Sequence, residues 1–419
     1  MGTNRAGRRR ACGATVALFV VGALVGACPS PSASPRRDGA PLASGVDAAP
    51  YAPAAVADAG AVQAAAVEAG AEVAADAGAK AADAGARVAS GPRTLGVVDL
   101  HVDLAWAVHA KGASLADPGL QASLARVRRG QVGALVVPLF VDRGYAMTPA
   151  EARAAYQATF ASVAARVKSE GAGALTPFFA APEPGRVRML VSFEGMDGFV
   201  DDLASARAWV ARGACFAGLV HSRTNALGGA SQDPDPKRRA VGLTARGKAL
   251  AEALVDAGAV LDVAHASDAT VDDLAAVAEA RGVPLVDTHT GARALADIPR
   301  NLDDARIARV ARSGGVVGVS LYTGHLTARG HGAKATLDDY VRHVEHVRSI
   351  GGVAAVAIGS DLEGAITEPE GADGAATWPA LDQRLAARGW SERDRDALFR
   401  ANALRVLDGA AARGCGRDR

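Results

Sequence analysis

Residues that could bind metal ions stand at the ends of several short apolar runs in this chain. His101 and Asp103 form the segment His-Val-Asp, and residues two apart in an extended segment project to the same side. Glu194, His265 and His289 each follow an apolar run of their own. Imidazole nitrogens and carboxylate oxygens are zinc ligands, although each of these residues taken singly fits a capping, solvated or hydrogen-bonded core residue as well.

The five residues together indicate a metal site if the fold brings them to one place. Unpaired acids and imidazoles in a shared pocket would be costly, whereas three histidines, one aspartate and one glutamate suit two cations such as zinc. Glu194 offers two carboxylate oxygens and can bridge the pair. Two ions about 3.5–4 Å apart would hold and deprotonate a shared water, making a hydroxide nucleophile near neutral pH. The set therefore predicts a hydrolase with two Zn²⁺ per chain.

Other motifs support no rival chemistry. The chain has no Gly-x-Ser-x-Gly elbow, and Gly228-Gly229 lacks the Lys-Ser/Thr that follows in a phosphate loop. In the segment His-Val-Glu-His, the spacing of His343 and His346 around Glu345 matches no zinc-peptidase helix and predicts a solvated helix face. Three further histidines fall in expected rim loops without a spacing signal: His109, His325 and His331.

The segments that must position these residues alternate between short apolar runs and longer stretches of helical period. This alternation is typical of βα repeats around a parallel sheet. Eight runs are expected to form strands: Leu95–His101, Gly133–Phe140, Arg188–Glu194, Phe216–His221, Ala259–His265, Pro284–His289, Gly315–Tyr322 and Val353–Asp361.

Helix signals fall between these runs. Ser267 is expected to cap a helix over 268–281, Thr244 to open one that stops at Gly258, and Thr336 to open one that ends at Gly351-Gly352. Eight strands with intervening helices predict a (β/α)8 barrel of the TIM type, whose chemistry sits where the carboxyl ends of the strands converge. Most of the expected strands end in a residue that can bind metal or move a proton: His101, Glu194, His221, His265, His289 and Asp361.

Composition narrows the class of protein. With 49% hydrophobic and 22% charged residues, the 419-residue chain is neither wholly disordered nor a multi-span membrane protein. Its 46 basic and 45 acidic residues leave a net charge of +1, so nucleic acid is not an expected partner. Four cysteines exclude a disulfide scaffold. Cys215 and Cys415 could pair in an oxidising compartment, but free thiols are the favoured expectation because Cys215 lies beside a buried strand.

The N-terminus has the layout of an export signal. Arginines at 5–10 precede the apolar run 14–27, and Val25-Gly26-Ala27-Cys28 resembles the lipobox of bacterial lipoproteins. We expect a signal peptide over 1–27, a lipid anchor on Cys28 and an alanine-rich tether over 28–92, with an uncleaved membrane anchor as the alternative. Either would place the rest of the chain outside the inner membrane, facing the periplasm or the cell surface.

Longer motifs resemble a known family, the membrane (renal) dipeptidases, which are zinc peptidases of family M19 related to the amidohydrolases. The resemblance covers about residues 95–410 in consistent order. It rests on these segments: VVDLHVDLAW, LVSFEGMDGF, HSRTNALGGAS, GLTARGKAL, LDVAHASDAT, DTHTGARAL, IPRNLDDARIARVARSGGVVGVSLY, VAIGSDLEGA and NALRVL.

The resemblance implies a role for each matching residue. His101, Asp103 and Glu194 would bind one zinc, and Glu194 would bind the second together with His265 and His289. The family pattern further implies a substrate-binding and catalytic His221 at the scissile carbonyl, a proton-transferring Asp361, and two further substrate-binding residues: Arg300, which would grip the substrate carboxylate, and Tyr322, which falls near a substrate-contacting position.

The expected protein is a lipid-anchored dizinc dipeptidase with a barrel domain over 93–413 and a tail over 414–419. Its substrates would be dipeptides, including some with a C-terminal D-residue, and a homodimer is left open. Two departures, Leu362-Glu363 after Asp361 and Arg400-Ala401 before Asn402, could reshape the pocket. The alternatives are an amidohydrolase acting on lactones or N-acyl amino acids, and a non-catalytic solute-binding lipoprotein.

Overall fold

The computed structural model describes residues 94–328 and 334–418. The predicted signal peptide, the lipidation residue Cys28, the tether over 28–92 and His331 lie outside the described residues. Within the described ranges, no helix combines the length and apolar character needed to cross a membrane.

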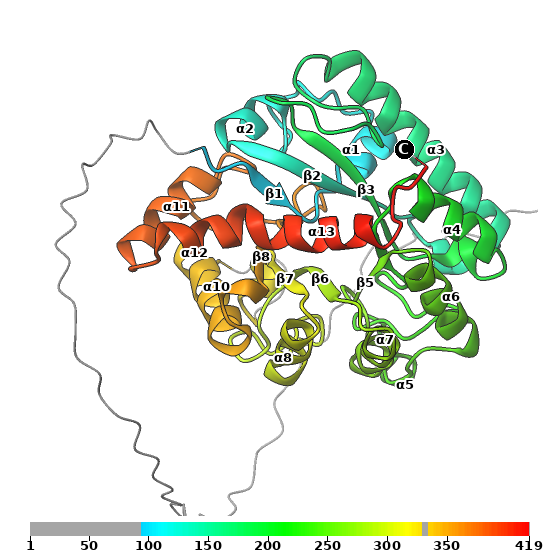
Figure 1. Cartoon of the computed structure of the whole chain (residues 1–419). Helices are drawn as coiled ribbons and strands as arrows, with labels where there is room; N and C mark the ends of the chain where they lie inside the picture. Colours follow the sequence, from blue (N-terminus) through cyan, green and yellow to red (C-terminus); the bar gives the residue numbers. More distant parts are fainter. Residues whose placement is uncertain (1–93, 329–333, 419) are drawn as a thin grey trace, which may run out of the picture. The chain divides into compact units, whose positions relative to one another are not determined.

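Eight parallel strands close into a barrel in sequence order, as the alternating pattern predicts (Figure 1). Each strand lies within its expected run or extends it by one residue, and several are shorter than expected. Their bounds are β1 Val97–Asp99, β2 Val132–Leu139, β3 Arg188–Glu194, β4 Phe216–Gly218, β5 Val260–Asp262, β6 Leu285–Thr290, β7 Val316–Val319 and β8 Val356–Ile358. The fold is a TIM-type (β/α)8 barrel.

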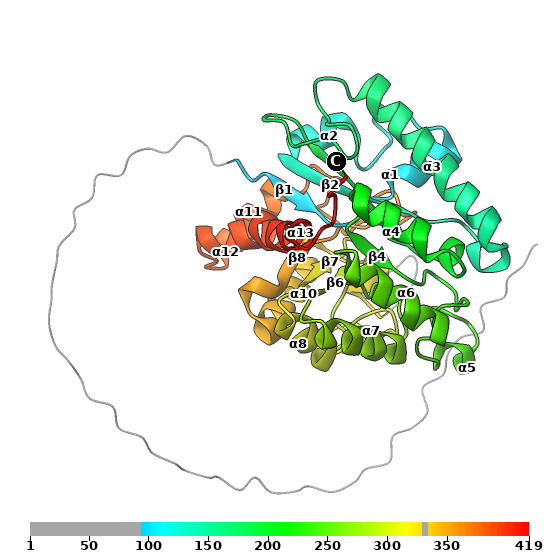
Figure 2. The same ribbon diagram turned by 45° about the vertical axis from the view of Figure 1, so that its right-hand side comes forward.

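Helices pack around the outside of the strands (Figures 1 and 2). Short 3-10 turns occupy Gly144–Ala146, Asp197–Phe199 and Val353–Ala355, and a π turn occupies Ala397–Ala401. The α-helices are α1 Leu104–Lys111, α2 Leu124–Arg129, α3 Pro149–Glu170, α4 Leu203–Arg212, α5 Pro236–Arg239, α6 Ala245–Asp256, α7 Asp268–Ala280, α8 Asp304–Arg312, α9 Thr323–Leu326, α10 Leu337–Gly351, α11 Trp378–Ala387, α12 Glu392–Asp396 and α13 Asn402–Ala412.

The expected helix starts are confirmed by their caps. The side chains of Thr244, Ser267 and Thr336 each accept a hydrogen bond from a backbone N–H three residues ahead, at the starts of α6, α7 and α10. Such a cap satisfies one of the N–H groups that the first helical turn leaves without an intrahelical acceptor. The strands are buried on both faces, which explains why they read as continuous apolar runs.

Helix α13 covers the amino-terminal end of the barrel. Asn402 donates to the carbonyls of Val353 and Val356, and Arg405 donates to those of Gly314 and Ala354. These carbonyls lie just before β7 and β8, or at the first residue of β8. The helix therefore covers the end of the barrel opposite the carboxyl ends of the strands.

The chain beyond α13 returns to α4, and this corrects the expectation of free thiols. The backbone N–H groups of Gly416 and Asp418 donate to Val210 and Ala211 at 2.9 Å each. This path brings Cys415 to Cys215, and the two form a disulfide with a Cα–Cα distance of 5.7 Å. The position of Cys215 beside a strand did not leave it without a partner, because Cys415 is itself buried there. Figures 1 and 2 show the chain's C-terminus close to α4.

Candidate metal centre

The five predicted metal ligands meet at the carboxyl ends of the strands, around the carboxylate of Glu194. Its Oε1 lies 2.7 Å from Nε2 of His265 and 3.5 Å from Nε2 of His289. Its Oε2 lies 3.6 Å from Nε2 of His101, which in turn lies 3.7 Å from Oδ2 of Asp103. The two oxygens of Glu194 therefore face different histidines.

Two further predicted residues join this cluster. The donor atoms of Glu194, His221 and His265 lie within 4.8 Å of one another, as do those of His101, Asp103 and Asp361. A third group within the same limit contains His101, Glu194 and His289. Because Glu194 and His101 each belong to two groups, the groups form one continuous centre that could hold more than one ion.

Hydrogen bonds on the far side of each ring orient the imidazoles. Nδ1 of His265 lies 2.7 Å from Oε1 of Gln232, an acceptor, so this nitrogen carries the proton. Nδ1 of His101 and Nδ1 of His289 lie 3.2 and 3.1 Å from the hydroxyl oxygen of Thr288. Protonation at Nδ1 leaves the lone pair on Nε2, which faces Glu194 in all three rings, as a metal ligand requires.

The donor atoms fit a cation. Among the described residues, Nε2 of His101 and Oδ1 of Asp103 are buried without a hydrogen-bond partner. Burial opposes a charge on His101, yet the carboxylates of Glu194 and Asp103 raise its pKa well above the usual value. Two buried carboxylates thus favour positive charge at this position, and a metal ion would supply it while satisfying both orphaned atoms.

Burial and charge set the remaining pKa values. Burial and the nearby Arg300 guanidinium lower the pKa of His265 to about 3, and burial and His101 lower that of His289, so both rings are neutral at pH 7. Burial raises the pKa of Asp361 well above its usual value, and the charge of Asp103 adds to the effect. A carboxyl group that retains its proton in such a site can donate it during a reaction.

The centre opens into a cavity of about 350 Å³. Phe140, after β2, packs against His221, with ring centroids 5.0 Å apart. His221 lies after β4, with its side chain 29% exposed and its Nε2 3.9 Å from Glu194 Oε1. The predicted residues Tyr322 and Asp361 line the cavity. The remaining lining residues are Asp103, Trp106, Asp142, Glu194, Ser222, Gln232, His265, His325, Gly364, Ala365 and Ile366.

Arg300 is close to the centre but is not among the residues that line the cavity. Its side chain is 3% exposed, its Nη2 donates to the carbonyl of His289 at 2.6 Å, and its Nη1 lies 3.9 Å from Oδ2 of Asp287. The buried Nε of Arg300 has no hydrogen-bond partner among the described residues. The structure thus places this predicted substrate-binding residue directly behind His289.

Other residues of the site were not predicted from the sequence. His325 is buried in the one-turn helix α9, three residues after Tyr322, and both line the cavity with ring centroids 4.9 Å apart. The i, i+3 spacing that places them on one side was the available signal. His109, expected in a rim loop, lies in α1 and contacts Ser162. Trp106, three residues after Asp103, also lines the cavity and was not predicted to do so.

The prediction of a solvated His-Val-Glu-His face was wrong for His343. This ring is buried and accepts a hydrogen bond from the N–H of Ala292 at 2.9 Å, with its Nε2 3.2 Å from the carbonyl of Leu326. It thereby joins the loop after β6 to α9. Burial lowers its pKa to about 4, which keeps Nδ1 free to accept. His346, by contrast, lies 2.7 Å from the exposed carboxylate of Asp304.

Two residues of the centre have left-handed backbone conformations. His265 has φ of 63° and Asp361 has φ of 65°, in a region that side-chain-bearing residues seldom adopt. Asp361 is held there partly by its N–H, which donates to the carbonyl of His101 at 3.0 Å. Strain of this kind persists where the surrounding structure imposes it, and it concentrates at functional sites.

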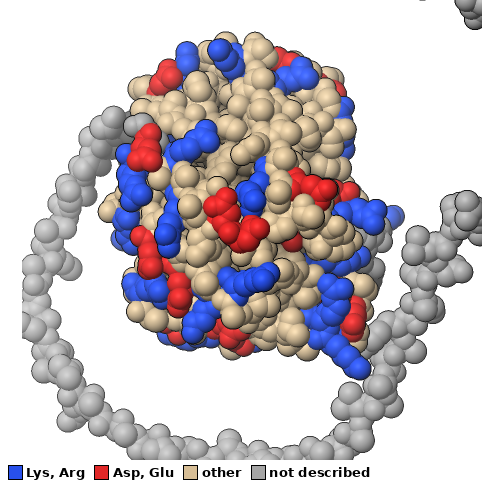
Figure 3. Space-filling view, turned by 90° about the vertical axis from the view of Figure 1, so that its right-hand side faces the viewer, with Lys and Arg blue, Asp and Glu red and all other residues tan. Residues whose placement is uncertain are grey.

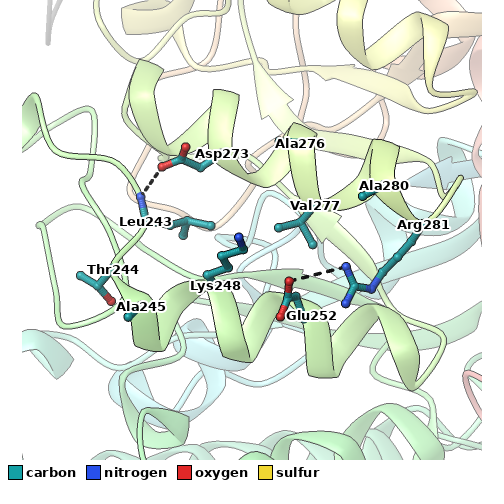
Figure 4. A pocket seen from close by; sticks show the side chains of 10 residues that line it. All are labelled: Leu243, Thr244, Ala245, Lys248, Glu252, Asp273, Ala276, Val277, Ala280 and Arg281. Carbon is teal, nitrogen blue, oxygen red and sulfur yellow. Dashed lines mark hydrogen bonds and ion pairs between the residues drawn. The ribbon is translucent and has the colours of Figure 1, made fainter.

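A second hollow, of about 290 Å³, lies on the outer wall between α6 and α7 (Figure 4). Three of its four charged side chains bind neighbours. Arg281 pairs with Glu252 at 3.7 Å, and Asp273 accepts from the N–H of Leu243 at 2.7 Å. On the face drawn in Figure 3, acidic and basic side chains are intermingled. The cavity at the strand ends differs from this hollow, because it is lined by atoms that could bind a metal ion.

A family model described as Membrane dipeptidase (Peptidase family M19) matches residues 91–414. The chain belongs to the membrane dipeptidase family. This confirms the resemblance seen in the motifs. Because the match covers every strand and helix described above, the centre at the strand ends lies wholly within the family domain.

Several curated proteins are similar to parts of this chain. Dipeptidase 3 of Mus musculus is 32% identical over 166 residues, which are 40% of this chain and 32% of that protein. Dipeptidase aclJ of Aspergillus oryzae is 29% identical over 224 residues, 54% of this chain and 52% of that protein. These matches thus span about a third to a half of the relatives. An uncharacterized protein encoded in the pqqA 5' region of Klebsiella pneumoniae is 34% identical over 222 residues, 52% of this chain and 80% of that protein.

Solved structures share the fold at lower identity. The probable dipeptidase PvdM of Pseudomonas aeruginosa superposes with a TM-score of 0.65 at 20% identity, covering 76% of this chain and 96% of that one. A metallopeptidase of Rhodobacter sphaeroides, liganded with a phosphinate mimic of L-Ala-D-Ala, superposes with a TM-score of 0.63 at 23% identity, covering 76% and 100%. The barrel is therefore common to these proteins.

Gly364 provides a test of the centre's geometry. A Cβ at this position would lie 2.6 Å from both Oδ2 of Asp103 and Oδ1 of Asp361. We therefore expect Gly364→Ala to push the two carboxylates aside and to weaken Zn²⁺ binding by about tenfold or more, measured by titration of metal-free protein. Gly409→Ala is the control, because its Cβ would meet only Nη1 of Arg413 at 3.4 Å. Wild-type zinc affinity in Gly364→Ala would contradict the described placement of the carboxylates.

Proposed function

We propose that this chain is a metallodipeptidase that uses two Zn²⁺ ions. The observation that carries the proposal is the position of Glu194, whose two carboxylate oxygens face different histidines within 3.6 Å. Membership of the membrane dipeptidase family supports the reaction class. The experiment that tests it is the release of amino acids from L,L and L,D dipeptides by the zinc-loaded full-length protein.

The proposed ligands divide between the two ions. His101 and Asp103 would hold one ion, His265 and His289 the other, and Glu194 would contribute one oxygen to each. Imidazole and carboxylate ligands suit zinc, and neutral rings such as His265 and His289 bind it without first losing a proton. Bound zinc would supply Lewis-acid activation of water and of the peptide carbonyl.

The chain's own side chains would handle the charge and the proton. His221 lies in the cavity beside Glu194, where an Nε2–H would stabilise the oxyanion that develops on the scissile carbonyl. Asp361 is buried against the charge of Asp103, so its carboxyl can hold a proton and deliver it to the departing amine. The enclosing walls, including Trp106 and Phe140, would limit water around these groups.

Arg300 would select substrates with a free C-terminal carboxylate, with Tyr322 as a further contact. The unpartnered Nε of Arg300 supports this role, because a buried guanidinium N–H favours an anionic acceptor. A C-terminal D-residue is included in the proposal because the Rhodobacter sphaeroides relative was liganded with an L-Ala-D-Ala mimic. A broader amidohydrolase acting on lactones or N-acyl amino acids is the rival, and it would not need a carboxylate at that end.

The proposal also includes the limits of the catalytic domain and the localisation of the protein. The catalytic domain would occupy 93–413, with the tether over 28–92 linking it to a lipid-modified Cys28 on the outer side of the membrane. The support is the lipobox-like sequence Val25-Gly26-Ala27-Cys28 after an apolar run.

Glu194→Gln tests the shared ligand. The substitution keeps the shape of the side chain but removes its charge, so both ions should bind more weakly, whereas His289→Ala should mainly release one. Elemental analysis should find about two zinc ions per wild-type chain. Dipeptide hydrolysis should fall by at least 100-fold in Glu194→Gln, since both ions depend on it. Absence of zinc from zinc-replete wild-type protein would overturn the proposal.

Arg300 can be tested by changing both the enzyme and the substrate. A charge-assisted bidentate contact contributes about 2–4 kcal/mol, so Arg300→Met and amidation of the dipeptide should each lower kcat/KM by ~30- to 1000-fold. The substitution and the amidation applied together should lower kcat/KM little more than either change alone, because both remove the same interaction. Zinc content is measured alongside, because Arg300 also donates to His289.

Arg281→Met is the matched control for this cycle, because Arg281 pairs with Glu252 and Asp256 between α6 and α7, away from the cavity. In this variant, amidation of the dipeptide should lower kcat/KM by the same factor as it does in the wild type. Efficient cleavage of amidated dipeptides by the wild type would remove Arg300 from the proposal and favour the broader amidohydrolase.

The anchor is tested by Cys28→Ser. Lipidation requires the thiol, so the variant should leave the membrane fraction or accumulate as an unprocessed precursor, with its catalytic activity retained. Immunoblotting of membrane and soluble fractions measures the change. Unaltered processing and membrane association would show that the chain is held at the membrane by some other means.

A further inference from the structure

A single buried hydroxyl contacts two imidazoles of the proposed centre. The oxygen of Thr288 lies 3.2 Å from Nδ1 of His101 and 3.1 Å from Nδ1 of His289. The same hydroxyl donates to Oδ2 of Asp262 at 2.6 Å. Both Thr288 and Asp262 are buried, and neither lines the cavity. These two residues therefore lie behind the histidines and out of reach of substrate.

The direction of each hydrogen bond follows from counting hydrogens. Asp262 accepts from three donors, because its Oδ1 also receives the backbone N–H groups of Ala264 and Thr288 at 3.0 Å each. The only hydrogen of the Thr288 hydroxyl is thus committed to Asp262. Its two lone pairs remain for the Nδ1–H groups of His101 and His289. Asp262 in this way determines which nitrogen of each ring carries the proton.

The backbone of Thr288 is closely confined. A Cβ on Gly359 would lie 1.7 Å from the carbonyl oxygen of Thr288, and a Cβ on Gly318 would lie 2.1 Å from it. Glycine at both positions lets β7 and the residue after β8 approach β6 closely. The branched Cβ of threonine also restricts its χ1 rotation, so the hydroxyl has little freedom to turn away. The acceptor for both rings is consequently fixed in place.

We propose that Asp262 and Thr288 act as a positioning pair that couples the two metal sites. One oxygen orients two imidazoles that belong to different ions, so loss of that oxygen should weaken both ions together. Gln232 offers a contrast, because it orients His265 alone. The inference rests on the proposed two-ion centre, and it adds residues that bind neither metal nor substrate.

The test titrates metal-free, full-length protein with Zn²⁺ in competition with a chelator. Thr288→Val keeps the shape of the side chain and should lower the affinity for both ions by about 10- to 100-fold. Thr288→Ser keeps the hydroxyl and should restore most of that affinity. Gln232→Leu should weaken one ion only. Thr176→Val is the matched control, since Thr176 is equally buried but bonds to Val187 and Met189 away from the centre.

A second variant tests the direction of the hydrogen bonds. In Asp262→Asn the amide Oδ1 keeps its two backbone donors while the NH₂ group faces Thr288. The hydroxyl must then turn its hydrogen toward one ring and force that ring to protonate Nε2. The zinc affinity of Asp262→Asn should fall at least tenfold, while its melting temperature should stay close to that of Thr176→Val. This variant keeps the inference testable if Thr288→Val fails to fold.

The outcomes separate this inference from the proposed function. If the wild type binds two zinc ions and Thr288→Val or Asp262→Asn binds them equally well, the positioning pair is wrong while the two-ion centre stands. Loss of only one ion in Thr288→Val would also overturn the coupling. If the wild type itself binds fewer than two zinc ions, the proposed function fails first.

Discussion

The structure depends on one electrostatic requirement, which is that the buried negative charge of Glu194 must be compensated by positive charge or hydrogen-bond donors. Its oxygens lie 2.7–3.9 Å from Nε2 of four histidines, and these ring nitrogens could hold a cation beside the carboxylate or donate to it. Three of those rings, His101, His265 and His289, have an acceptor behind them that holds the tautomer, and Gln232 and Thr288 provide it. The arrangement is thus built outward from one anion.

The barrel meets this requirement because parallel strands deliver side chains from distant parts of the sequence to one rim. Helix α13 closes the opposite end through Asn402 and Arg405, so the carboxyl ends of the strands remain accessible. The cost appears as left-handed conformations at His265 and Asp361. Such strain is tolerated where the surrounding structure holds the backbone, as the hydrogen bond from the N–H of Asp361 to the His101 carbonyl illustrates.

Much of this arrangement could be predicted from the sequence. The eight apolar runs and the caps Thr244, Ser267 and Thr336 reflect local burial and local hydrogen bonding, which residue order records directly. The ligand types at strand ends were recognisable because rim position follows from strand order. The family motifs then implied roles for His221, Arg300 and Asp361 that the spacing of these residues in the sequence does not indicate.

The contacts missed from the sequence join residues far apart in it. The partners of Thr288 lie 187 and 26 residues away, and those of His343 lie 51 and 17 residues away. No local pattern marks a threonine that accepts hydrogen bonds from two imidazoles. The helical spacing around His343 likewise does not indicate which face of α10 meets the loop after β6. The pairing of Cys215 with Cys415 spans 200 residues and depends on the path taken after α13.

That disulfide bears on how the chain avoids mispairing during maturation. Four cysteines permit three fully paired arrangements, and Cys12 and Cys28 would compete for Cys215 long before Cys415 is synthesised. In the proposed mature form Cys12 has left with the signal peptide and the sulfur of Cys28 carries a lipid. Two thiols then remain, and they have a single possible bond to form. Lipid attachment would thus serve oxidative folding as well as location, by removing the last incorrect partner.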